Sequence, residues 1–387
     1  MNEKEIFHMN DKNLSNWWSE YKNKNIKNLK SAKLPSFKHG SNILIEPTFK
    51  FNELSSKILS KNNIKITADK KEVKIVNGIC DDIIEFLEEK WEDQHSDNWV
   101  WYFHNLFSNN CTFIYIPKHI TANINIERII DKDNVLISLF ILADIGSKAR
   151  IIFNKNGKET ANYSSELVRI IAKEDSFIEL ICTQKLPKGL TFFQNRKSIG
   201  DTNSEINWLD IFIGGEYIRS ETTSCLNNRL ARVKNILLYF AQNNQKNDFY
   251  NSAIHNFSET KSDLIVKGAL VDQAKALSRS LIKIMPSASN SKGCEKQEAI
   301  ILGSKAEADA IPHLEVENSN VKCSHSSTIG KIDNDKMFYL MSRGLKETEA
   351  INLVVQGFME PVVKTLPLEY AVELNRLIQL EMTGSVG

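Results

Sequence analysis

The stretch that decides the fold is a threefold repeat, which reads GSKARI at residues 146–151, EDSFI at residues 174–178 and TNSEI at residues 202–206. Each copy is a small or acidic turn followed by the start of an apolar strand. When the isoleucines that end the three copies are aligned, they lie 27 and 28 residues apart. Strands that recur at a nearly fixed period without long intervening helices indicate a solenoid, and a parallel β-helix fits better than a helical repeat.

A period of two extends around this repeat, from about Cys111 to Lys331. It appears as short β-type runs of four to six residues, such as those that contain Ile124 and Ile126 or Ile206 and Trp208. Clusters of Asp, Asn, Ser and Gly separate the runs, where a doubly wound βαβ sheet would need helices of ten or more residues. A β-sandwich with uneven loops is the alternative that periodicity alone leaves open.

Helical patterns flank this region. Amphipathic helices are expected within residues 13–29 and residues 81–91, where aromatic and aliphatic residues recur at helical spacing. The chain is therefore divided into a mostly helical N-terminal region (1–105), a mainly β, right-handed parallel β-helix core (106–332) and a C-terminal helical region (333–387).

Three helices are expected in the C-terminal region. Asp333 is placed to cap the N-terminus of the first helix, and Gly344 follows its C-terminus. The second helix is expected over residues 347–358, ending before Pro361, and the third over residues 365–382. These helices would cover the open end of a solenoid, whose strand edges are otherwise unpaired.

The composition argues against several classes of function. Of 387 residues, 42% are hydrophobic and 25% charged, and the net charge of +1 gives no general attraction to nucleic acid or anionic lipid. The longest apolar run, at residues 135–143, is about half of the ~20 residues that a membrane helix needs. The first residues have no secretory apolar stretch, and six scattered cysteines form no CxxC pair. We therefore expect a cytoplasmic protein with reduced thiols, bound neither to membranes nor to nucleic acid.

Several catalytic signatures are absent from the sequence. There is no G-x-x-x-x-G-K-[ST] loop to hold a nucleotide phosphate, and no H-E-x-x-H, G-x-S-x-G or G-x-G-x-x-G motif. The chain is therefore not expected to be a P-loop ATPase or an enzyme of these classes.

One short segment could bind a metal. In an extended strand, Cys323 and His325 lie two residues apart and point to the same face. A thiolate and an imidazole together could ligate iron or zinc, and Lys322 with a protonated His325 would lower the pKa of the thiol. A closed site needs about four ligands, so distant residues or a partner chain would have to supply the others. A chance pairing of the two residue types is the simpler explanation from spacing alone.

Other polar residues nearby have weaker support. Glu315 and Glu317 would share a face with Cys323 and His325 if one strand ran unbroken through all four, although a solvated acidic edge explains them equally well. His313 and His255 fit no motif and are expected to be ordinary surface or core histidines.

Beyond these patterns, the sequence resembles the SufB/SufD family of iron–sulfur cluster assembly proteins. The resemblance is carried by residues 282–291, 299–316 and 321–333, and it continues in order through residues 338–344 and 357–362. These motifs are specific in combination.

Within the family the chain is most similar to the SufD branch, with continuous similarity over about residues 280–365. Ser324 and Ser326 flank the histidine where SufB-type chains carry acidic residues, and Ala306 stands where SufB has its cluster-building cysteine. One departure from SufD is a serine pair, Ser326 and Ser327, in place of Gly-Ala.

The resemblance implies a right-handed parallel β-helix between helical regions, and a non-ATPase subunit of a cytosolic complex. The end of the β-helix would pair with a SufB-like chain, and the C-terminal helices would bind SufC, the ABC-type ATPase. His325 would then contribute to the nascent cluster at the SufB interface, with Cys323 nearby. Iron or a cluster would be held only transiently, and none would be bound tightly by the chain alone. The residues expected at the ATPase contact are Met337, Phe338, Arg343, Gly344, Phe358 and Pro361.

Three alternatives remain open at this point. A homodimeric scaffold could carry iron on Cys323 and His325 without SufB. A β-helix carbohydrate-active enzyme could use Glu315 and Glu317 as acid and base. The chain could also be a SufB-like paralogue in spite of Ala306.

Overall fold

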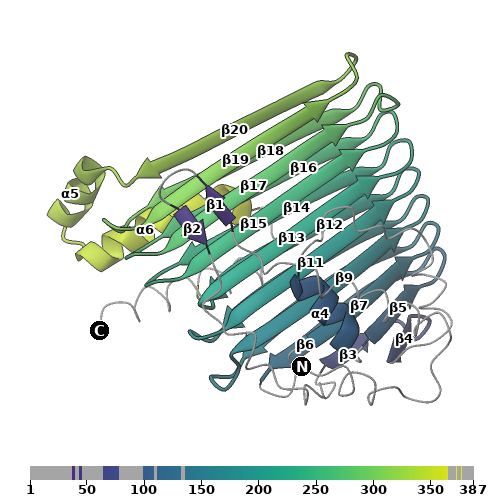
Figure 1. The fold of residues 1–387 in the computed structure, drawn as a ribbon, viewed down its shortest axis with the longest axis horizontal. Helices are drawn as coiled ribbons and strands as arrows, with labels where there is room; N and C mark the ends of the chain where they lie inside the picture. Colours follow the sequence, from purple (N-terminus) through teal and green to yellow (C-terminus); the bar gives the residue numbers. More distant parts are fainter. Residues whose placement is uncertain are drawn as a thin grey trace.

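The structure, a computed structural model, describes residues 37–39, 43–45, 64–77, 99–108, 111–131 and 136–364, and positions 372 and 376. The helices expected within residues 13–29 and 81–91, and all but two positions of the one over 365–382, lie outside these residues. The chain alternates between two nine-stranded sheets and so coils as a β-solenoid (Figure 1). The mainly β fold class is therefore confirmed.

The strands are assigned to the two sheets in spatial order. Sheet I contains β20 (Lys322–Lys331), β18 (Lys292–Ile301), β16 (Lys261–Leu270), β14 (Arg232–Ala241), β12 (Glu205–Gly214), β10 (Phe177–Leu186), β8 (Lys148–Gly157), β6 (Thr121–Ile130) and β3 (Ile64–Ala68). Sheet II contains β19 (Glu307–Val316), β17 (Lys275–Ile284), β15 (Lys246–His255), β13 (Tyr217–Leu226), β11 (Thr191–Gly200), β9 (Tyr163–Ala172), β7 (Leu136–Ala143), β5 (Cys111–Ile116) and β4 (Lys74–Asn77). All pairings from β5 to β20 are parallel, whereas β3 and β4 close one end in antiparallel fashion. A separate hairpin joins β1 (Phe37–His39) to β2 (Ile43–Ile45).

The parallel strands span the region in which the sequence shows a period of two, but β3 and β4 extend both sheets into residues 1–105, which were expected to be mostly helical. The first parallel strand begins at Cys111 and the last ends at Lys331. Most strands have ten residues, so the expected runs of four to six residues are too short. The reason is that inward positions within the strands are often polar, as at Glu166 and Arg196, and a polar residue interrupts the hydrophobic pattern.

The left-handed residues in the turns mark the period of the repeat. Gly146, Asp175 and Asn203 adopt left-handed backbone conformations, with φ of 65°, 57° and 52°. The amide of Gly146 donates to the carbonyl of Glu174 at 2.9 Å, and that of Asp175 donates to the carbonyl of Thr202 at 3.0 Å. Each turn is thus tied to the next, which stacks successive turns in register.

This stacking corrects the sequence alignment. Ile178 lies opposite Ile206, as aligned, but on its other side it lies opposite Ala149. Ile151 lies opposite Leu180, so its alignment with Ile178 was wrong by two residues. Because side chains alternate with a period of two, this shift leaves the same residues facing the interior.

The interior holds a fully buried polar network between apolar layers. The Glu166 carboxylate accepts hydrogen bonds from Arg128 at 3.3 Å, Lys155 at 2.7 Å and Gln194 at 2.8 Å. The Arg196 guanidinium lies within 4.6 Å of the Trp208 ring and forms a two-pronged ion pair with Asp210. Charges are tolerated here because each one has a partner of opposite sign and further hydrogen bonds.

A helix that the sequence analysis did not predict, α4 (Trp99–Phe107), lies on the outer face of sheet II (Figure 1). Trp101 packs edge-on against Phe193. His104 lies between Ser165, at 2.7 Å, and Ser138, at 3.0 Å. Burial lowers the pKa of His104 to about 3, so it serves as a neutral hydrogen-bonding group that anchors the helix.

Two helices follow the last strand. Helix α5 (Asn334–Ser342) is capped by the Asp333 side chain and is followed by Gly344, with φ of 96°, as predicted. Helix α6 (Glu347–Val363) continues beyond the expected end at residue 358 and contains Pro361. The helix tolerates this proline because the residues after it, Val362 and Val363, are buried against sheet I. Across the described residues, no helix combines the length and apolarity that a bilayer span requires.

Candidate functional site

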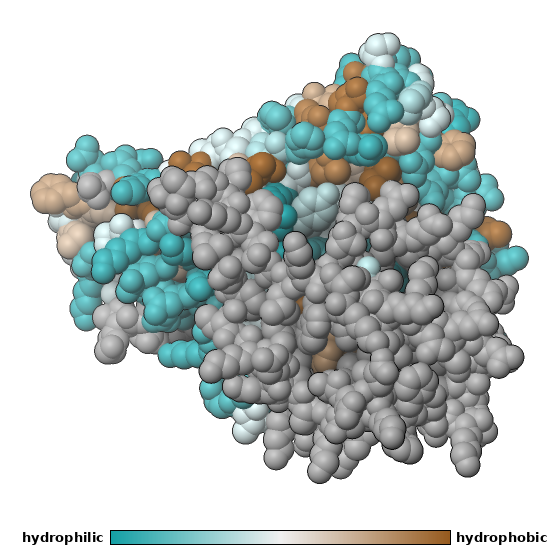
Figure 2. Space-filling view, viewed as in Figure 1, coloured by the Kyte–Doolittle hydropathy of each residue, from teal (hydrophilic) through white to brown (hydrophobic). Residues whose placement is uncertain are grey.

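The solenoid is open at the end formed by β19 and β20, which are the last strands of their sheets (Figure 1). On β18 the interior-facing side chains of Glu295 and Gln297 are buried. On β20 the equivalent positions are half-buried or exposed, because no further turn covers them in the described part of the chain. Apolar residues Val316 and Ile329 are exposed at this end, where brown patches interrupt the teal surface in Figure 2.

Cys323 and His325 lie on one face of β20, as predicted, and this face is the interior one. They are opposite Gly293 and Glu295 of β18 in the parallel ladder. His325 is exposed, whereas Cys323 is half-buried at the edge of the apolar core. Burial raises the pKa of the Cys323 thiol, so the predicted lowering by Lys322 is wrong. The physical reason is that Lys322 points to the opposite face of the strand.

Glu295 is a site residue that the sequence analysis missed. Its side chain is only 1% exposed, and one carboxylate oxygen, Oε1, accepts a hydrogen bond from Gln297 at 2.7 Å. The other oxygen, Oε2, has no hydrogen-bond partner among the described residues. Burial raises the pKa of Glu295, while hydrogen bonds to Ser280 and Gln297 and, to a smaller extent, the charge of His325 act in the opposite direction. The signal that could have found it is its position one solenoid turn before His325, on the same interior face.

These side chains do not yet form a closed metal site. Among the described residues, no three histidine, cysteine, aspartate or glutamate side chains are already grouped closely enough to hold an ion. The structure does bring Glu295, Cys323 and His325 to one face of two adjacent strands.

The acidic pair suggested by the sequence is separated from this face. Glu315 lies on β19 and Glu317 in the turn that follows, so they share no strand with Cys323. Lys283 binds the Glu315 carboxylate at 2.9 Å and holds its pKa below the usual value. A carboxyl group that stays ionised is a poor general acid, so this geometry does not favour the carbohydrate-active enzyme.

The two remaining histidines behave as expected. His313 is exposed and lies 3.5 Å from Glu315. His255 is buried, with its ring nitrogens 2.7 Å from Thr260 and 2.8 Å from Ser262, and burial lowers its pKa to about 4.

The residues expected at the ATPase contact divide into two groups. On α5, Phe338 is 74% exposed and Tyr339 57% exposed, while Met337 is buried beneath them. Arg343 and Gly344 are exposed, and the Arg343 guanidinium lies 5.2 Å from the Tyr339 ring.

The residues on α6 are placed differently. Pro361 is exposed, but Phe358 is half-buried, with its ring 4.6 Å from the Lys267 ammonium group of sheet I. Phe358 therefore helps to hold α6 on the solenoid, and the accessible aromatic surface belongs to α5.

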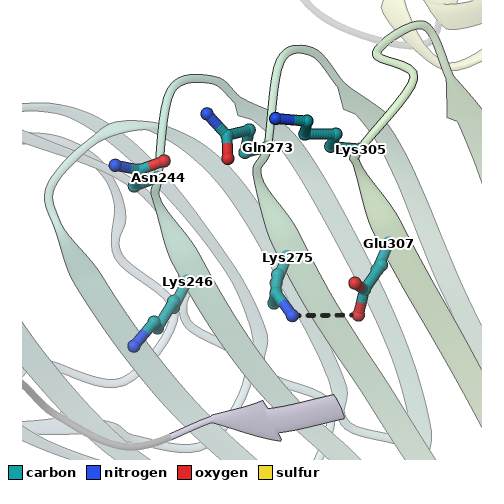
Figure 3. Close-up of a pocket in the computed structure, with 6 residues that line it drawn as sticks. All are labelled: Asn244, Lys246, Gln273, Lys275, Lys305 and Glu307. Atoms are coloured by element: carbon teal, nitrogen blue, oxygen red, sulfur yellow. Dashed lines mark hydrogen bonds and ion pairs between the residues drawn. The ribbon is translucent and has the colours of Figure 1, made fainter. Parts of the chain in front are cut away.

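A separate cleft of about 450 Å³ lies on the rim formed by the turns into β15, β17 and β19 (Figure 3). Its lining residues are Asn244, Lys246, Gln273, Lys275, Lys305 and Glu307. Lys275 and Glu307 are paired at 3.0 Å. None of the predicted site residues lines it, and Cys323 follows a turn on the opposite rim.

Comparison with known proteins connects this architecture to one family. The family model described as "SUF system FeS cluster assembly, SufBD core domain" matches residues 129–358, which is more than half of the chain. The iron-sulfur cluster assembly SufBD family protein of Staphylococcus saprophyticus is 29% identical over 282 residues, or 71% of this chain and 61% of that protein. The proteins of the same description from Staphylococcus epidermidis and Staphylococcus haemolyticus are each 28% identical over the same shares. The chain thus spans about three fifths of the length of these relatives. It belongs to the SufBD family of the SUF system for iron–sulfur cluster assembly.

Proposed function

We propose that the chain is a SufD-like scaffold subunit of a cytoplasmic iron–sulfur cluster assembly complex and has no enzymatic activity of its own. The observation that carries this proposal is the last turn of the solenoid, where His325 lies exposed on an edge strand whose outer side pairs with no other strand in the described part of the chain. Unpaired edges are prone to pair with another chain, and proteins usually cover or blunt them. A SufB-like chain would cover this edge and place its own ligands opposite His325.

The second contact would be with a SufC-like ABC ATPase. The aromatic side chains of Phe338 and Tyr339 stand exposed on a short helix that projects from the solenoid (Figure 1). Exposed large aromatic residues are favoured anchors in protein interfaces. Nucleotide hydrolysis by the partner would then move α5 and α6 and transmit strain to the last turn.

Assignment to the SufD branch depends on the substitutions around the site. Ala306 carries no thiol where SufB-type chains have the cluster-building cysteine, and Ser324 and Ser326 provide no carboxylate beside His325. The chain would therefore supply an imidazole, while the partner would supply the thiolate and carboxylate. Iron and sulfide are the cargo of this site and would stay only until the cluster is passed on.

Co-expression with the SufB-like and SufC-like chains of the same organism tests the proposal. Affinity purification followed by native mass measurement should give one complex that contains all three chains. A stable homodimer that retains neither partner would favour the homodimeric scaffold. A reconstituted, coloured cluster on the isolated chain would favour a SufB-like paralogue.

A further inference from the structure

We propose that Glu295 is a metal ligand, and that it binds a divalent iron ion together with His325 and Cys323 at the open end of the solenoid. This inference rests on the proposed function and adds a ligand from inside the solenoid that the family resemblance did not supply.

The register of the β18–β20 ladder brings the three side chains close together. Glu295 and His325 are direct neighbours across the β18–β20 ladder, and Cys323 lies two residues before His325 on the same face. Adjacent strands are ~4.8 Å apart, and alternate residues along a strand are ~6.6 Å apart. All three side chains therefore leave the same face of two adjacent strands, at spacings that rotamer changes can close around one ion. Because His325 is exposed, its ring can change rotamer without disturbing the core.

The two oxygens of the Glu295 carboxylate differ in their hydrogen bonding. Its Oε1 accepts a hydrogen bond from Gln297, whereas Oε2 is buried and has no partner in the part of the chain that the structure describes. A buried polar atom that lacks a hydrogen bond costs on the order of 1–3 kcal/mol, and more when it is charged. Oε2 lies near an exposed imidazole at the open end of the solenoid. Its lack of a hydrogen bond is explained if it coordinates a cation while the cluster is being assembled.

Neighbouring groups would support this ligand. Gln297 donates to both Glu295 and Ser280, so the carboxylate is oriented by a chain of side chains from both sheets. Hydrogen bonds of this kind fix the geometry of metal-binding carboxylates.

The chemistry of the three donors also fits iron. One carboxylate, one imidazole and one thiolate are suitable for a divalent metal of intermediate softness. The Cys323 thiol would release its proton to solvent on binding, so the two anionic donors would balance the charge of the ion. Three protein ligands leave positions open on the metal, which a partner's thiolate or sulfide could fill.

Anaerobic titration of the full chain with Co(II), as a coloured substitute for ferrous iron, tests this proposal. We expect saturable visible bands together with a thiolate-to-cobalt charge-transfer band. Loss of a group that only orients a metal ligand weakens metal binding about 10–100-fold, so Glu295→Gln, which removes a ligand, should weaken Co(II) binding by at least that much. The matched control is Glu307→Gln, which removes an outward-facing carboxylate from the other terminal strand and should leave the affinity unchanged.

Two results would overturn the proposal. One is the absence of saturable Co(II) binding by the wild-type chain, and the other is equal affinity in wild type and Glu295→Gln. If Glu295→Gln fails to fold by circular dichroism, Glu295→Asp keeps the charge but retracts it, and unchanged affinity there counts equally against the proposal. Capture of the partner chains is measured in a separate experiment. Co(II) binding without a Suf complex would contradict the proposed function, whereas a Suf complex without Co(II) binding would contradict only the role of Glu295.

Discussion

Lys267 and Phe358 join the C-terminal helix to the solenoid. The Lys267 ammonium group donates to the carbonyl oxygen of Phe358 at 3.0 Å, lies 4.6 Å from the centre of its ring and is paired with Glu298 at 2.9 Å. One nearly buried cation thus satisfies a helix carbonyl, an aromatic face and a carboxylate at once. Through this contact, a movement of α6 would directly displace side chains of sheet I.

We expect Lys267→Met to loosen α6 while the solenoid stays folded. The variant loses a charged hydrogen bond worth about 1.5–3 kcal/mol, although the apolar stem is kept. Hydrogen exchange of the α6 amides should therefore become faster. The matched control is Lys296→Met, since Lys296 also pairs with Glu298, at 2.8 Å, but is half exposed. Equal exchange rates in the two variants would show that Lys267 does not hold the helix.

The exposed aromatic surface of α5 makes a second prediction. Phe338→Asp should release the ATPase in a pull-down and leave the thermal unfolding temperature unchanged, because the side chain is 74% exposed. Phe257→Asp is the control, since Phe257 is also exposed but lies in a turn between β15 and β16. Retained ATPase with Phe338→Asp would place the docking surface elsewhere.

Acid should destabilise the fold partly through His255. Burial lowers its pKa from 6.5 to about 4 in the folded protein, so the unfolded chain binds this proton more readily. Its contribution to stability is complete above pH 6.5 and is lost as the pH falls towards 4, by about 3 kcal/mol in all.

Denaturant unfolding at a series of pH values measures this effect. His255→Gln keeps a side chain that can hydrogen-bond Thr260 and Ser262 but cannot take up a proton. Its unfolding free energy should fall less steeply than that of wild type between pH 6.5 and 4. Identical slopes would exclude His255 as a source of the acid sensitivity.

Sequence patterns predicted the architecture better than its interior. The period of two gave the limits of the parallel strands at Cys111 and Lys331, because inward apolar residues recur there, but it missed the antiparallel strands β3 and β4 that extend the two sheets. It could not identify the network around Glu166, since a buried ion pair has the same residue types as a solvated surface. The alignment error at Ile151 had a related cause: apolar residues alternate along the strand, and only the left-handed turn residues mark the register.

The candidate site, too, could be predicted only in part from the sequence. Spacing placed Cys323 and His325 on one face, but the third residue of that face comes from the previous solenoid turn. Glu295 and His325 become neighbours only once the length of each turn is known. The pKa of Cys323 likewise depends on burial at the edge of the core, which the adjacent lysine in the sequence does not reveal.

The most direct test of the central claim is the iron and sulfide content of the purified three-chain complex with His325→Ala. The matched control is His313→Ala, which removes an exposed histidine from the neighbouring strand of the same last turn. We predict that both variant complexes assemble, that the His313→Ala complex accumulates cluster as wild type does, and that the His325→Ala complex accumulates none. A normal cluster yield from His325→Ala would contradict the role of this chain at the site of cluster assembly.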